Sequence, residues 1–121
     1  MAMAQDNCRA AGRPCFSRLA GVALGTMIGD ALGMPVEGWP AHDIAIRHGH
    51  LDTFKQGGLP AGSYTDDSQM MIAILETLAH GGRLDPQLLA GRFVASYQPW
   101  RGYGRRIAGV MDRLAKGAPW E

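Results

Sequence analysis

Two aspartates directly follow a threonine within residues 62–70, and this run has the clearest potential for chemistry in the chain. Thr65, Asp66 and Asp67 stand where the apolar periodicity of a helix begins, and a helix N-terminus needs only one oxygen-bearing cap. Adjacent carboxylates repel each other, and the helix dipole offsets about 0.3–1 kcal/mol of this for each. One hydroxyl and two carboxylates are hard oxygen donors of the kind that Mg²⁺ or Mn²⁺ accepts. The run therefore predicts either a divalent-metal site or an over-supplied helix cap, and residue types alone leave both open.

Asp30 and Glu37 form a second pair of carboxylates, seven residues apart, around the end of an apolar segment. Burying Asp30 costs free energy unless it is hydrogen-bonded, so we expect it to accept backbone N–H groups from the following loop. Pro35 restricts the backbone just before Glu37. Glu37 is therefore expected to project from a constrained turn.

Glycines recur every four residues along the same apolar segment, at Gly21, Gly25, Gly29 and Gly33. The three interior glycines cost about 3 kcal/mol of helix stability relative to alanine, so a close approach should compensate for them. We expect a neighbouring helix to pack there. The alternative is that Gly29 and Gly33, with Asp30 between them, keep the wall of a site thin where a substrate approaches.

The C-terminal third contains further candidate residues. Tyr103 lies between two glycines, where it anchors a loop or stacks on an adenine or ribose ring. The arginines of this region are expected on a solvated helix face, with phosphate contact as the alternative. They are Arg101, Arg105, Arg106 and Arg113.

Helical periodicity predicts the elements that must position these residues. We expect helices over 17–32, 67–80, 86–97 (with Asp85 as N-cap) and 105–116. The long connection 33–64 contains six glycines and three prolines; no helix is placed in it, and loops this long are usually functional when they are ordered. No strand is predicted, so the fold class is all-α.

Composition sets further bounds. The 121 residues suit one domain, and a net charge of +1 gives no basis for a nucleic-acid or anionic-membrane partner. Residues 1–16 are expected to form a disordered tail with Cys8 and Cys15 as reduced thiols. Asp30 interrupts the most apolar stretch, so no membrane span is expected, and a cytoplasmic location is the default expectation.

Residues 29–37 (GDALGMPVE) and 62–70 (GSYTDDSQM) together resemble the N-terminal signature of the ADP-ribosylglycohydrolase family. The stretch 101–104 (RGYG) is also similar to the family, and the resemblance covers residues 17–121. It implies a compact helical fold with two Mg²⁺ or Mn²⁺ ions in a cleft. It also implies an ADP-ribosylated protein or an ADP-ribose-containing small molecule as partner.

The resemblance implies roles for individual residues. Thr65, Asp66 and Asp67 match the family's metal-binding triplet. Glu37 matches an acidic residue that reaches the metals and contributes to catalysis or gating, and Asp67 is its expected catalytic companion. We expect substrate contacts from Gly29, Asp30 and Tyr103.

One part of the family pattern is missing. Family enzymes are more than twice as long, and no second Asp-x-Asp-Thr group of ligands follows Asp67 here. The chain is therefore expected to be an inactive N-terminal part of a hydrolase that cleaves the glycosidic bond of ADP-ribose. The alternatives are a non-catalytic ADP-ribose-binding family member or an unrelated helical interaction module.

Overall fold

The computed structural model describes residues 16–121, and over those residues the chain is helical with no strand. The prediction of an all-α fold is confirmed. The elements in chain order are α1 (Phe16–Gly33), η1 (Met34–Val36), α2 (Ala41–Arg47), α3 (Asp66–Gly81), α4 (Pro86–Ser96), η2 (Pro99–Arg101) and α5 (Arg105–Ala115), where η denotes a 3-10 helix. Cys8, Cys15 and the expected tail lie outside the described residues, except Phe16, which begins α1.

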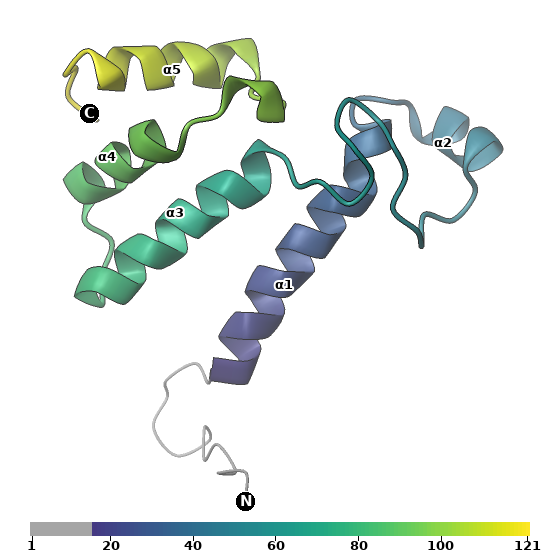
Figure 1. Ribbon diagram of the computed structural model, residues 1–121, viewed down its shortest axis with the longest axis horizontal. Helices are drawn as coiled ribbons and strands as arrows, with labels where there is room; N and C mark the ends of the chain where they lie inside the picture. The colour runs from purple at the N-terminus through teal and green to yellow at the C-terminus, as the bar shows by residue number, and fades with distance from the viewer. Residues whose placement is uncertain (1–15) are drawn as a thin grey trace, which may run out of the picture.

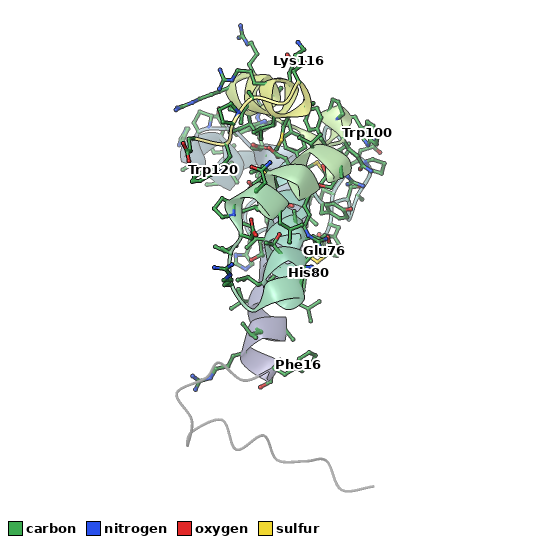
Figure 2. The ribbon with its side chains drawn as sticks, turned by 90° about the vertical axis from the view of Figure 1, so that its left-hand side faces the viewer. Phe16, Glu76, His80, Trp100, Lys116 and Trp120 are labelled. Atoms are coloured by element: carbon green, nitrogen blue, oxygen red, sulfur yellow. The ribbon has the colours of Figure 1, made fainter. Side chains whose placement is uncertain are left out.

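The helices form two arms that meet near the start of α3 (Figure 1). In one arm α3 packs against α4, and α4 packs against α5. The other arm is α1, whose last turns approach α3 while its N-terminal part extends away (Figures 1 and 2). The apolar core is small and lies along these contacts. Its buried members are Ala31, Met34, Val36, Ala73 and Met111.

Local sequence signals explain the ends of the four predicted helices, which fall within one residue of the expected positions. Asp85 caps α4 as predicted, because its side chain accepts hydrogen bonds from the backbone N–H groups of Gln87 and Leu88 at 3.0 and 3.1 Å. Gly82 and Gly117 end α3 and α5 in the left-handed conformation, with φ of 68° and 84°.

The connection 33–64 is more ordered than predicted, because it contains η1 and α2. No helix was predicted there, so η1 and α2 add to the four predicted helices. Helix α2 has seven residues, follows Pro40 without a side-chain cap, and buries none of its residues. It therefore lacks a cap and is shorter than the window over which helical periodicity can be recognised in a sequence.

The glycine face of α1 is open over the described residues. A Cβ atom at Gly21, Gly25, Gly29 or Gly33 would meet nothing within 4 Å outside the local helix. The expectation that a neighbouring helix packs on this face was therefore wrong for this part of the chain. The physical reason is that α3 approaches only the end of α1 that carries Ala31.

Most of α1 also exposes large apolar side chains. They are Phe16, Leu19, Val22, Leu24 and Ile28. Figure 2 shows Phe16 at the end of α1 farthest from α5 and Lys116. By length and composition the segment Phe16–Val36 meets the requirement for a membrane span, although no span was expected from the sequence. Within its most apolar 18-residue window, 17% is buried. Core helices and signal sequences meet the same requirement, so this property alone does not identify a span.

Candidate functional site

An open cavity of about 450 Å³ lies where the end of α1 faces the start of α3. Its lining contains three carboxylates and two glycines with open faces. The lining residues are Thr26, Gly29, Asp30, Gly33, Met34, Glu37 and Asp67. Four of the residues predicted from the sequence therefore share one cavity: Gly29, Asp30, Glu37 and Asp67.

Asp30 connects the two helices that form this cavity. Its Oδ2 atom accepts hydrogen bonds from Thr65 N (2.9 Å), Ser68 N (3.1 Å) and Ser68 Oγ (2.5 Å). Its Oδ1 atom accepts one from Thr65 Oγ1 (2.6 Å). The expectation that Asp30 accepts backbone N–H groups is confirmed, although the donors stand at the far end of the connection rather than next to α1.

This arrangement caps α3 from another helix. Thr65 is the N-cap residue by position, but its own side chain makes no capping hydrogen bond. Asp30 instead accepts the N–H groups of the N-cap and N3 residues, the two that a capping box satisfies locally. Asp30 lies in the last turn of α1, where the helix dipole disfavours an anion, and faces the start of α3, where the dipole favours one.

The donors around Asp30 are withdrawn from solvent. Thr65 is 4% exposed and Ser68 is fully buried. Burial alone would raise the pKa of the Asp30 carboxyl, but the hydrogen bonds from Ser68 and Thr65 outweigh burial and lower that pKa. Asp30 is therefore ionised at neutral pH, and both of its oxygens are engaged within the protein.

Because Asp30 accepts the N–H groups at the start of α3, Asp66 and Asp67 do not cap the helix. Over residues 16–121 neither carboxylate accepts a hydrogen bond from another group of the chain. Desolvation, together with the negative charges of Asp66 and Asp30, raises the pKa of Asp67. A cation bound beside these carboxylates would relieve that repulsion.

Glu37 reaches the cavity from a tight turn. Its φ and ψ of −56° and 132°, the φ of 76° at Gly38, and a 3.0 Å hydrogen bond from Trp39 N to Val36 O describe a type II turn. Gly38 supplies the positive φ that this turn requires. The prediction that Glu37 projects from a constrained turn is confirmed.

The donor chemistry of the site suits a hard divalent cation, but the donor set is partial. Carboxylate and hydroxyl oxygens are the ligands that Mg²⁺ and Mn²⁺ prefer. Within residues 16–121 no three Asp, Glu, His or Cys side chains are grouped closely enough to hold an ion on their own. The predicted metal ligands therefore do not form a complete binding group within these residues, and of the four only Glu37 and Asp67 line the cavity.

The segment 97–104 packs against the start of α3 beside Asp66. Gln69 is buried, and its Oε1 atom accepts hydrogen bonds from Tyr103 Oη (2.9 Å) and from Gln98 N (3.2 Å). The Tyr97 ring meets the Tyr103 ring edge-on, with centroids 4.7 Å apart. Burial, followed by the negative charge of Asp66, raises the pKa of Tyr103. Tyr103 thus lies near Asp66 but does not line the cavity.

Arg101 and Gly102 complete this contact. The Arg101 guanidinium stacks 3.9 Å from the centroid of the Tyr64 ring, and its Nη1 atom donates to Tyr64 O at 2.8 Å. The expectation that Arg101 belongs to a solvated face was therefore wrong. Gly102 has φ of 98°, and a Cβ there would lie 3.6 Å from Asp66 Oδ1.

Sequence reasoning did not identify Gln69 or the Arg101–Tyr64 pair as parts of the site. Gln69 follows the acidic run by two positions, and that nearness to Asp67 was the available signal. The stacking of Arg101 on Tyr64 joins residues 37 positions apart, which no local pattern reveals.

Comparisons of the sequence with known proteins identify a family and several relatives. The sequence profile of the ADP-ribosylglycohydrolase family matches residues 12–121. The chain is 32% identical over 102 residues to a protein of Archaeoglobus fulgidus, covering 80% of this chain and 33% of that protein. It is 31% identical over 110 residues to ADP-ribosylhydrolase ARH3 of Xenopus tropicalis, covering 84% and 30% of the two chains.

A further relative is the ADP-ribosyl-dinitrogen reductase glycohydrolase of Rhodospirillum rubrum, with 38% identity over 77 residues and coverage of 61% and 26%. The chain spans about a third of the length of the curated relatives it matches. Since the profile match extends over most of the chain, from the start of α1 through α5, the chain belongs to the ADP-ribosylglycohydrolase family.

Proposed function

We propose that the protein containing this chain hydrolyses the glycosidic bond that links ADP-ribose to a protein side chain or a related acceptor. The observation that carries the proposal is the cap that Asp30 provides for α3, because it leaves Asp66 and Asp67 uncommitted at the helix start. Asp67 shares an open cavity with Glu37. The names of the relatives, an ADP-ribosylhydrolase and an ADP-ribosyl-dinitrogen reductase glycohydrolase, support an ADP-ribose-containing substrate.

The metal-binding part of the proposal assigns Thr65, Asp66, Asp67 and Glu37 as the ligands that this chain contributes to two Mg²⁺ or Mn²⁺ ions. Bound metal would supply Lewis-acid polarisation and a water molecule of lowered pKa. The oxygen donors and the raised pKa of Asp67 support this assignment. The remaining ligands would be water molecules or groups from outside residues 16–121.

The chain's own residues would position the substrate and move a proton. Glu37, held by the type II turn, would orient the attacking water and accept its proton, with Asp67 as its partner across the cavity. The open faces of Gly29 and Gly33 would allow a sugar ring to approach the end of α1. Asp30 would border the substrate, and Tyr103, fixed by Gln69, would contact it from the α3–α5 side.

Manganese titration tests the metal-binding part. Isothermal titration of the 121-residue chain with Mn²⁺ should give weak binding heats that disappear in the double variant Asp66→Asn/Asp67→Asn. Asp52→Asn, an exposed aspartate of the 48–64 loop, is the matched control and should titrate like the unaltered chain. Equal heats from the unaltered chain and the double variant would contradict the assignment.

A turnover assay tests the reaction. Full-length protein should release ADP-ribose from a mono-ADP-ribosylated peptide in Mg²⁺ or Mn²⁺, and chelator should abolish the release. The 121-residue chain alone should show none, because its described residues supply a partial ligand set. Metal-dependent turnover by the short chain would disprove that expectation.

The partial ligand set also favours a second candidate, a non-catalytic family member that binds ADP-ribose. The two are separated by full-length protein. Saturable ADP-ribose binding without release from the peptide, at any divalent metal concentration, would favour the binding role.

A further inference from the structure

The two carboxylate oxygens of Asp30 face different sets of donors. Oδ2 accepts from three donors, Thr65 N, Ser68 N and Ser68 Oγ, at 2.9, 3.1 and 2.5 Å. Among the described residues, Oδ1 accepts from Thr65 Oγ1 alone, at 2.6 Å. One oxygen thus holds the start of the α3 backbone, and the other holds a single hydroxyl.

The direction of the Thr65 hydrogen bond follows from chemistry. An ionised carboxylate has no proton to donate, so the Thr65 hydroxyl must donate its proton to Oδ1. A hydroxyl carries one proton and two lone pairs. With its proton held by Asp30, Thr65 Oγ1 can act only as an acceptor, or as a metal ligand, toward any other partner.

We propose that Asp30 is a positioning residue for metal binding. It holds the Thr65 hydroxyl proton inward so that the Thr65 oxygen offers lone pairs, and it caps α3 so that Asp66 and Asp67 keep theirs. This inference rests on the proposed function, in which Thr65 is a metal ligand. Beyond that function, the inference states that Asp30 of α1 orients the lone pairs of the Thr65 oxygen toward the metal without itself having to contact the metal.

The variant Asp30→Asn separates the two roles of Asp30, which are to cap α3 and to orient the Thr65 hydroxyl. The three donors at Oδ2 require an oxygen there, so the new amide group must place its nitrogen opposite Thr65 Oγ1. That nitrogen donates, so the Thr65 hydroxyl must turn, use a lone pair as acceptor and point its proton elsewhere. The α3 backbone keeps its cap, whereas the Thr65 ligand loses its orientation.

Manganese affinity is the decisive readout. Electron paramagnetic resonance of free Mn²⁺ should show affinity about 10- to 100-fold weaker in Asp30→Asn than in the unaltered chain, as for other residues that orient metal ligands. In a Thr65→Val background, Asp30→Asn should have a much smaller effect, because the hydroxyl it orients is gone and only the loss of one nearby negative charge remains. Ser68→Ala is the matched control. It removes a hydrogen bond to the same carboxylate and should lower thermal stability while leaving Mn²⁺ affinity within about threefold.

The outcomes separate this inference from the proposed function. Tight Mn²⁺ binding by folded Asp30→Asn, or equal effects of Asp30→Asn with and without the Thr65 hydroxyl, would overturn the inference alone. Absence of Mn²⁺ binding by the unaltered chain would overturn the metal assignment and the inference together. Circular dichroism establishes that each variant is folded at the titration temperature.

A measurement on the unaltered chain covers the case in which Asp30→Asn does not fold. The buried Thr65 hydroxyl proton should give a slowly exchanging NMR resonance that persists when Mg²⁺ is added, while the Thr65 Cβ resonance shifts. Loss of the hydroxyl resonance on adding Mg²⁺ would show that Asp30 does not hold the proton in the metal-bound state, and would overturn the inference.

Discussion

Gly57 and Pro35 are in backbone contact across the connection between α1 and α3. A Cβ atom at position 57 would lie 2.6 Å from Pro35 Cα and 2.9 Å from Met34 Sδ. Gly57 N also donates to Leu59 O at 3.1 Å, which bends the loop at this point. Since η1 leads directly into the turn of Glu37, the loop supports the backbone from which that carboxylate projects.

Gly57→Ala should therefore destabilise the chain by about 1–3 kcal/mol, because the added methyl group cannot be accommodated without moving the Pro35 backbone. Gly58→Ala is the matched control, because a Cβ there meets nothing within 4 Å. Urea unfolding followed by circular dichroism measures both. Equal midpoints for the two variants would show that the loop does not press on η1 in solution.

Asp30→Ala should cost about 2–4 kcal/mol of unfolding free energy, because it leaves buried donors of Thr65 and Ser68 without an acceptor. Asp52→Ala in the exposed loop should change stability by no more than about 0.5 kcal/mol. Thermal and urea unfolding at neutral pH provide the comparison. A loss below about 1 kcal/mol for Asp30→Ala would mean that α3 finds another cap.

Glu37→Gln should leave stability within about 0.5 kcal/mol, since the side chain is exposed and its turn is set by the backbone. In full-length protein the same change should reduce kcat about 10²- to 10⁴-fold if Glu37 accepts a proton in the reaction. ADP-ribose release under saturating substrate tests this. Wild-type kcat in the variant would remove Glu37 from the mechanism.

Tyr103→Phe removes the hydroxyl that donates to Gln69 and should destabilise the chain by about 0.5–1.5 kcal/mol. The raised pKa of Tyr103 also has a sign that can be checked. Folding favours the neutral phenol of Tyr103. Its contribution to the free energy of unfolding is therefore complete below about pH 10 and declines as the pH rises toward the pKa of the folded state. Absorbance titration of tyrosinate should lose its latest-titrating component in Tyr103→Phe. Loss of an earlier component instead would contradict the burial of this hydroxyl.

The helices with strong local signals could be predicted from the sequence, and those without them could not. Asp85 at a cap and Gly82 at a helix end are choices that neighbouring residues dictate. Helix α2 has neither a side-chain cap nor a buried face, and its seven residues are too few for a helical period to be recognised.

The candidate site shows the same division. The acidic run and Glu37 could be singled out because their residue types suit metal chemistry and Pro35 constrains the backbone beside them. The pairing of Asp30 with Thr65 and Ser68 could not, because it joins residues 35 and 38 positions apart. The expectation for Asp30 was correct in the type of donor, but it did not specify Thr65 and Ser68, since only the tertiary fold decides which N–H groups reach a carboxylate.

The remote cap on α3 also has a consequence for the order in which the chain folds. Its hydrogen bonds form only after the chain between Asp30 and Thr65, which are 35 positions apart, closes into a loop, at an entropic cost of about 3 kcal/mol plus a constant. The first turn of α3 gains its acceptor only at that step, so it should be the last part of the helix to become protected from solvent. The amide hydrogens of Thr65 and Ser68 would then exchange together with deuterium whenever the end of α1 detaches. The exchange of these two amides would thereby report the opening and closing of the contact between α1 and α3.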